Sequence, residues 1–288
     1  MNYTIENDYL SITVKDKGAE LTSLFSRGNQ KEYLYQVQEG FWNKQSPVLF
    51  PFIGALKDDQ YSYQGQTYSM TKHGFARDHI FELADKSINR LDFVLSSRTT
   101  KLENYPFDYE FHIIYHLIKD TLVVKYKVVA GDNDLYFTVG GHPAFNVPLA
   151  KDLSFEDYFV EIKTAGPIDR YPLNGAYIDQ SLIVRDAPKQ IALKHDLFTN
   201  DLLLYKTPNA TKISIRSEKD PSGVALTYSS VPYVGLWTLT NHAPFLCIEP
   251  WTGLPDDINS NGQLQDKLGI QHLDAGKEFI MDYTIEVF

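Results

Sequence analysis

The sequence predicts an all-β protein, built as a single large antiparallel β-sandwich that spans residues 1–288. Apolar and polar residues alternate in short runs along the chain, which is typical of strands with one buried face. The chain is rich in aromatic residues, with 19 Tyr, 17 Phe and 3 Trp, and aromatic side chains favour strands. Long helical patterns do not alternate with the strand patterns, which argues against a doubly wound fold.

The strand pattern is clear in four segments. The first three alternate between apolar and polar residues, and the fourth is a longer β-rich run that could be buried on both faces. They are Leu10–Lys15, Lys212–Ser217, Met281–Phe288 and Thr121–Ala130. We expect hairpin turns at Lys119-Asp120 and Gln64-Gly65. The segment His195–Asp201 predicts a short helix.

Proline and glycine gather in a few segments that we expect to be loops at the rim of the sandwich. These are Ser46–Gly54, Gly140–Pro148 and Pro250–Pro255. No repeat of fixed period occurs, and no linker rich in Gly, Ser or Pro divides the chain. A single domain is therefore the simplest interpretation.

Charge and cysteine content narrow the class of protein. The chain has 27 basic and 37 acidic residues, a formal net charge of −10, which argues against binding to nucleic acid or to anionic lipid. The one cysteine, Cys247, forms no internal disulfide. We see no signal-peptide pattern and no apolar run long enough to span a membrane. A soluble cytoplasmic protein is expected, and its oligomeric state is left open.

Three segments place ionisable residues in apolar surroundings: Lys72–Asp78, Gly141–Asn146 and Cys247–Trp251. Taken singly, His142 is most simply a hydrogen-bonded structural histidine, and Glu249 a carboxylate at the end of a strand. Taken together, the two could give and take protons at neutral pH if the fold brings them to one substrate. Trp251 would then form an aromatic wall beside Glu249.

These segments resemble the aldose 1-epimerase (galactose mutarotase) family, and more closely its LacX-like branch. The matching stretches are FPFIGALKD, KHGFARD, GGHPAFN, GLWT and CIEPWTGLPDD, in the family's order. The resemblance implies a galactose mutarotase-like supersandwich. It also implies an enzyme that opens and recloses the ring of an aldose to exchange its α and β anomers, with no metal or nucleotide cofactor. The partner would be a small sugar, an aldohexose.

The resemblance also implies roles for single residues. His142 matches the general acid, and would give its proton to the ring oxygen, while Glu249 matches the general base for the hydroxyl on C1. His73 matches a second histidine that holds a sugar hydroxyl or the ring oxygen. Trp237 and Phe145 match parts of the pocket wall. We expect Gly140 and Gly141 to let the backbone bend close to the sugar, so that His142 points into the cleft.

Two features depart from the family pattern. Ala55 occupies a position where many relatives have an arginine that grips sugar hydroxyls, and Lys57 or Arg77 could supply the missing donor. The family also has an acidic sugar-binding residue between the positions of His142 and Glu249. Asp179 lies in that interval, as do several other acids.

Three other functions remain open. A sugar-binding module or sensor could keep the aromatic pocket without turnover. A metal enzyme could use two histidines and one glutamate, although the sequence has no His-x-His or His-Glu-x-x-His spacing. A hexose-phosphate epimerase would need a cluster of cations, for which the motifs offer only Lys57, Lys72 and Arg77.

Overall fold

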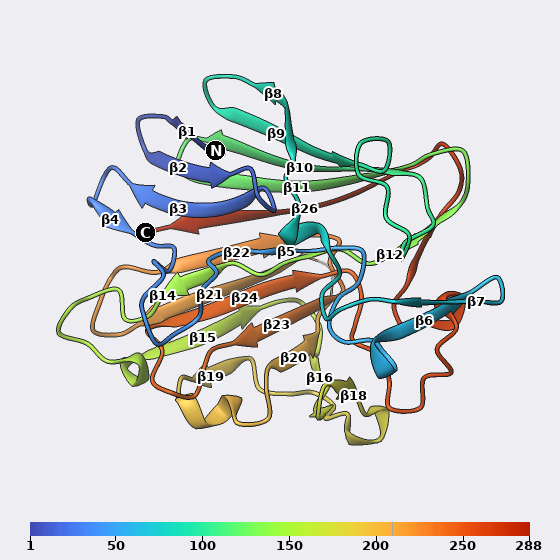
Figure 1. Ribbon diagram of the computed structural model, residues 1–288. Coiled ribbons are helices and arrows are strands. Elements are labelled where there is room, and N and C mark those ends of the chain that lie inside the picture. The colour runs from blue at the N-terminus through green and yellow to red at the C-terminus, as the bar shows by residue number, and fades with distance from the viewer. Residues whose placement is uncertain (209) are drawn as a thin grey trace.

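The structure, a computed structural model, describes residues 1–208 and 210–288. Within these residues the chain forms antiparallel sheets joined by loops and by 3-10 helices of three or four residues (Figure 1). The helices are η1 (Lys57–Asp59), η2 (Ala76–Asp78), η3 (Phe155–Asp157), η4 (Gln180–Leu182), η5 (His195–Phe198) and η6 (Leu264–Asp266). The predicted all-β, antiparallel fold is confirmed. No helix in the described ranges is long and apolar enough to cross a membrane.

The largest sheet has nine strands and runs the length of the molecule. In spatial order it contains β19 (Gln190–Ala192), β15 (Tyr158–Lys163), β21 (Thr211–Ser217), β22 (Val224–Tyr228), β26 (Glu278–Val287), β11 (Thr121–Ala130), β10 (Tyr109–Ile118), β9 (Arg90–Ser96) and β8 (Glu82–Lys86). The C-terminal strand β26 lies in the middle of this sheet and joins its two halves.

Two smaller sheets accompany the nine-stranded one. A four-stranded sheet contains β1 (Asn2–Glu6), β2 (Leu10–Lys15), β3 (Glu20–Ser26) and β4 (Lys31–Glu32). A seven-stranded sheet contains β16 (Asp169–Arg170), β20 (Leu203–Lys206), β23 (Tyr233–Trp237), β24 (Phe245–Trp251), β13 (Gly140–Gly141) and β5 (Val48–Leu49), with β14 (Ala144–Asn146) also paired to β24. Three two-stranded pairs complete the fold: β6 (Gln60–Tyr63) with β7 (Gln66–Ser69), β12 (Leu135–Phe137) with β25 (Gln271–Leu273), and β17 (Leu173–Asn174) with β18 (Tyr177–Ile178).

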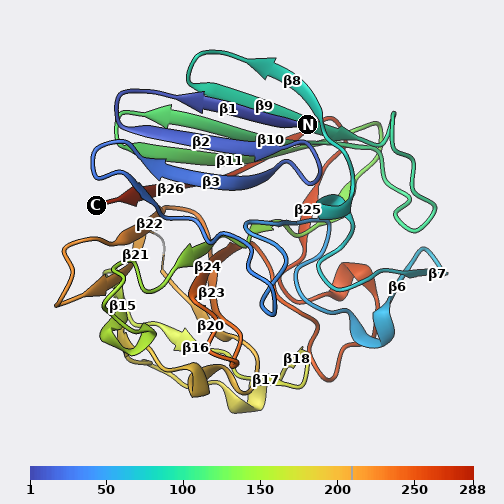
Figure 2. The same ribbon diagram turned by 60° about the vertical axis from the view of Figure 1, so that its left-hand side comes forward.

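One continuous hydrophobic core lies between the three large sheets. It includes Ile12 of β2, Phe111 of β10 and Leu246 of β24, all fully buried. Strands β1 to β3 lie beside β9 to β11, whereas β20, β23 and β24 lie beside β15, β21 and β22 (Figures 1 and 2). The smaller sheets thus cover different halves of the nine-stranded sheet, and the seven-stranded sheet keeps a second face turned away from this core.

The local predictions fare unevenly. The hairpin turns are confirmed, because Lys119-Asp120 joins β10 to β11 and Gln64-Gly65 joins β6 to β7. The run Thr121–Ala130 is not buried on both faces: its residues alternate between buried and half-buried, because the outer side of the sheet faces solvent. The helix predicted over His195–Asp201 is a 3-10 turn that ends at Phe198.

The glycine-rich and proline-rich segments are not only rim loops. Ser46–Gly54 contains β5, and Gly140–Pro148 contains β13 and β14. Pro250 lies within β24, next to its last residue. These segments form part of the seven-stranded sheet, so they hold their side chains on paired backbone as well as on loops.

Gly140 and Gly141 serve close packing and not a bend, because neither has a positive φ. β13 lies between β24 and β5. A Cβ on Gly140 would lie 2.5 Å from Cδ1 of Trp251, and a Cβ on Gly141 would lie 2.6 Å from the hydroxyl of Tyr283. The two glycines therefore let β13 pack closely against Trp251 on one side and Tyr283 on the other.

Replacing Gly141 by alanine should destabilise the fold by about 1–3 kcal/mol, because the added methyl group overpacks a closed site. Urea unfolding of Gly141→Ala against wild type would measure this cost. Gly28→Ala is the matched control, since its Cβ would meet nothing nearer than 4.0 Å. Equal stability of the two variants would show that the site relaxes freely.

Candidate active site

The outer face of the seven-stranded sheet carries a cavity of about 200 Å³. Its lining brings together residues from all three segments that the sequence indicated. The lining residues are Trp42, Lys72, His73, Arg77, His142, Asp201, Leu202, Trp237, Glu249 and Trp251. Two smaller apolar clusters on the same face flank it, one around Phe245 and Cys247 and one around Leu204 and Leu254.

Strand β24 supplies Glu249 to this cavity through its period-two pattern. Leu246 and Ile248 point into the main core. Cys247, Glu249 and Trp251 alternate with them and belong to the outer face. Directly opposite Glu249 on β23 is Gly235, where an added Cβ would lie 3.0 Å from Cδ1 of Leu202.

His142 lies between β13 and β14, on the far side of β24 from β23. Its Nε2 is 3.2 Å from Oε2 of Glu249. The ring of Trp42 stacks at an angle on the imidazole, with 4.8 Å between ring centroids, and Trp237 meets it edge-on at 5.6 Å. The histidine and the carboxylate thus form a close pair, enclosed by indole rings.

Burial controls the protonation of this pair. Removal from water raises the pKa of Glu249 well above its ordinary value, and the negative charge of Asp201 adds to this effect. Burial lowers the pKa of His142 to about 3, helped by the cations Lys72 and Arg77. With this pKa, the imidazole of His142 is neutral in the free protein at pH 7. The pair at neutral pH is best described as sharing at most one proton.

His73 is held in an unusual backbone conformation, with φ of 70°. Its own N–H donates to the carbonyl of Gly54, and its ring Nδ1 accepts the N–H of Gly54 at 3.1 Å. Because Nδ1 is an acceptor, the proton of the neutral ring lies on Nε2. Burial lowers the pKa of His73 well below its ordinary value. His73 therefore offers a fixed N–H donor to the cavity.

An ion pair lies at the cavity wall. Nζ of Lys72 is 3.3 Å from Oδ2 of Asp201, and both side chains are partly exposed. The guanidinium of Arg77 donates from Nη2 to the backbone carbonyl of Lys72 at 2.7 Å. Arg77 thus lines the cavity, and it also fixes the backbone of Lys72.

Three residues considered from the sequence lie elsewhere. Lys57 does not line the cavity, because its Nζ donates to the carbonyls of Ile258 and Ser260. Phe145 is buried in the main core, on the opposite face of the sheet from the cavity. Asp179 accepts the backbone N–H of Ser181 at the start of η4.

Four lining residues were not predicted: Trp42, Lys72, Asp201 and Leu202. Lys72 lies inside the stretch KHGFARD, where the sequence suggests it only as a cation for phosphate binding. Asp201 is one of the acids between His142 and Glu249, and it is the one that reaches the cavity. Trp42 belongs to no recognised stretch, and only its residue type could have suggested it.

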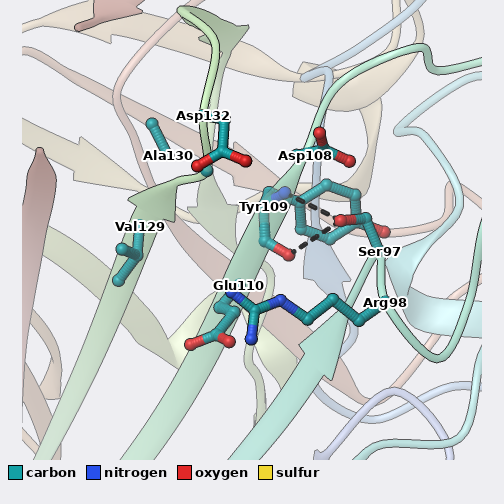
Figure 3. Close-up of a pocket in the computed structure, with 9 residues that line it drawn as sticks. Ser97, Arg98, Asp108, Tyr109, Glu110, Val129, Ala130 and Asp132 are labelled. Carbon is teal, nitrogen blue, oxygen red and sulfur yellow. Dashed lines mark hydrogen bonds between the residues drawn. The ribbon is translucent and has the colours of Figure 1, made fainter. Parts of the chain in front are cut away.

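A second cavity, of about 270 Å³, lies at the ends of strands β9, β10 and β11 (Figure 3). Its side chains include Arg98 and the carboxylates Asp108, Glu110 and Asp132. The hydroxyl of Ser97 accepts the N–H of Tyr109 and donates to its carbonyl, so this backbone is already satisfied (Figure 3). No residue predicted from the motifs lines this cavity.

Comparison with known proteins points to one family. The profile of the family described as "Aldose 1-epimerase" matches residues 1–264 of this chain. The plasmid-encoded protein LacX of Lactococcus lactis subsp. lactis is 29% identical over 278 residues, which cover 93% of each chain.

Solved structures agree with that match. A galactose mutarotase related enzyme from Lactobacillus acidophilus is 34% identical, with a TM-score of 0.96 over 100% of this chain and 97% of that one. A galactose mutarotase-like protein from Lactobacillus casei is 32% identical, with a TM-score of 0.91 over the whole of both chains. The profile match and these full-length likenesses show that the chain belongs to the aldose 1-epimerase family.

Proposed function

We propose that this protein is an aldose 1-epimerase that interconverts the α and β anomers of an aldohexose. The observation that carries the proposal is the pair His142 and Glu249, 3.2 Å apart in a cavity walled by indole rings. Such apolar walls with a few convergent polar groups are typical of small-molecule sites. Indole faces also suit the apolar face of a pyranose ring.

The close pairing suits the chemistry. The hydroxyl oxygen and the ring oxygen are both bonded to C1, so an acid and a base that serve them must lie side by side. Glu249 takes the proton of the C1 hydroxyl while His142 gives a proton to the ring oxygen. The bond from C1 to the ring oxygen breaks as the C1 carbonyl forms. Rotation about C1–C2 and the reverse transfers close the ring on its other face, which returns both protons.

The reactive pair carries one proton, which must lie on His142 when the ring opens. In the free protein burial favours that proton on Glu249. Oε2 and Nε2 are 3.2 Å apart without a hydrogen bond between them, so a rotation of the side chains would align them for its transfer. The fixed Nε2–H of His73 would then hold a sugar oxygen, while Asp201, Lys72 and Arg77 would bind the outer hydroxyls.

Removing either partner should abolish most of the rate. Glu249→Gln and His142→Ala should each lower kcat/KM by about 10²- to 10⁴-fold, the usual contribution of one placed acid or base. Polarimetry of freshly dissolved α-galactose and α-glucose, in the cold and in weak buffer, measures this rate above the spontaneous one.

The matched controls for those variants are His272→Ala and Glu156→Gln, which change exposed residues outside the cavity. Both should retain the wild-type rate. Folded wild type that binds these sugars without speeding anomer exchange would instead identify a non-catalytic sugar-binding protein.

The pH profile should reflect the shared proton. As the pH falls through about 3, the pair gains a second proton and activity is lost. As the pH rises through the raised pKa of Glu249, the pair loses its only proton and activity is lost again. The acid limb of kcat/KM should therefore lie below the ordinary glutamate value of 4.5. An acid limb at that ordinary value would contradict the shared-proton account.

A hexose-phosphate epimerase is the second candidate, because Lys72 and Arg77 both line the cavity. Asp201 already pairs with Lys72, however, which favours a neutral sugar. We expect glucose to react faster than glucose 6-phosphate in a side-by-side assay. If the phosphate is preferred, and if Lys72→Met lowers that preference by about 10- to 100-fold, the second candidate is correct.

A further inference from the structure

Cys247 is a buried thiol that the proposed reaction does not use. Its Sγ, a ring nitrogen of His142 and a carboxylate oxygen of Glu249 all lie within 4.8 Å of one another. Cys247 and Glu249 share the outer face of β24 because they are two residues apart. Cys247 also pairs with Ala144 of β14. His142 lies two residues before Ala144, so this pairing holds it near Cys247. Paired strands therefore hold the three side chains together.

A polar atom of this group lacks a hydrogen-bond partner. Among the described residues, Oε2 of Glu249 is buried and makes no hydrogen bond, although it lies 3.2 Å from Nε2 of His142. The Glu249 side chain is only 2% exposed. Buried polar atoms without partners cost free energy, so they are uncommon unless a ligand completes them. The carboxylate borders the cavity, where a ligand from solvent could reach it.

The chemistry of the three groups suits zinc. Thiolate sulfur, imidazole nitrogen and carboxylate oxygen are its usual ligands, and three protein ligands with one open position are typical of accessible zinc sites. Zinc bonds of about 2.0–2.1 Å to nitrogen and oxygen place two tetrahedral ligands about 3.3 Å apart. Nε2 of His142 and Oε2 of Glu249 are 3.2 Å apart, and a shift of about 1 Å brings Sγ into the same shell.

Charge balance supports the same ion. A divalent cation would neutralise one thiolate and one carboxylate, with the imidazole neutral, so no net charge would be buried at the three ligands. We propose that a zinc-class divalent cation binds Cys247, His142 and Glu249 at the floor of the cavity, with its fourth position facing the sugar site. Metal binding does not depend on the proposed function.

The consequence for activity does rest on the proposed function. A cation at this position holds both groups that move protons in the ring opening. Zinc should therefore inhibit anomer exchange, in contrast to a metal-dependent enzyme, which zinc would activate. The group Asp134, His272 and Asp274 offers a comparison, since its ligand atoms also lie within 4.8 Å of one another but belong to exposed residues.

Cobalt(II) provides a direct test because its bond to a thiolate absorbs strongly in the near ultraviolet. Cys247 is the only cysteine in the sequence, so any cobalt–thiolate band must arise there. The protein is first treated with a chelator and transferred to a buffer without added thiol reagents. Titration with Co²⁺ should then give this band with one equivalent of the metal, together with the visible bands of a tetrahedral ion. Added Zn²⁺ should remove both. Absence of the band would overturn the proposal.

Variants test whether Cys247 is a ligand of the metal or only lies near it. Cys247→Ala should lose the band and weaken Zn²⁺ binding, measured by calorimetry, by at least about 100-fold, because changes outside the ligand shell alone cost 10- to 100-fold. Its anomer exchange should stay near wild type and become insensitive to zinc. His272→Ala should change neither the cobalt–thiolate band nor the zinc sensitivity of anomer exchange. If Cys247→Ala does not fold, Cys247→Ser keeps the size of the side chain and should also lose the band.

The outcomes are distinguishable from failure of the proposed function. A cobalt–thiolate band in a protein that speeds no anomer exchange would support the metal site and reject the enzyme. Anomer exchange that persists with Zn²⁺ bound would reject the inhibition. Zinc affinity that is unchanged in Cys247→Ala would reject Cys247 as a ligand.

Discussion

Strand β24 separates two environments, and the cavity depends on that separation. Its even-numbered apolar residues, Leu246 and Ile248, anchor in the main core. The same pairing forces Glu249 onto the opposite face, because a shift of one residue would exchange every side chain between the two faces. Strands pair with β24 on both sides, so this register is fixed. A carboxylate that would otherwise prefer water is therefore held in an apolar setting by the stability of the core beneath it.

That enforced burial gives the pair its chemistry. Outside water, a charge interacts more strongly with its neighbours, and an unpaired one is costly. Glu249 and His142 lie 3.2 Å apart, and a single proton held on the carboxyl group leaves neither of them charged. The opposite directions of their pKa shifts follow from the same cause, since burial disfavours the charged form of each. Burial thus contributes most to setting the acid and the base, and the charges of Lys72, Arg77 and Asp201 in the same cavity add to it.

The fold and part of the site could be predicted from the sequence. The period-two runs report directly on half-buried strands, and the spacing of Glu249 and Trp251 places both on one face. Phe145 and Lys57 could not be placed, because a short strand can turn either face inward and a lysine can reach several carbonyls. Asp201 and Trp42 lie in segments without motifs, and only tertiary folding brings those segments to the cavity. The bend predicted at Gly140 and Gly141 is absent, because the two glycines allow close packing of β13.

The placement of the tryptophans has a practical consequence. The sequence contains three, Trp42, Trp237 and Trp251, and all three line the same cavity. Each comes from a different part of the chain, and they surround the histidine and the carboxylate. The tryptophan fluorescence of the protein therefore originates at this one place. Any molecule or ion that enters the cavity changes the surroundings of every indole at once, so the unmodified chain carries its own optical reporter of occupancy.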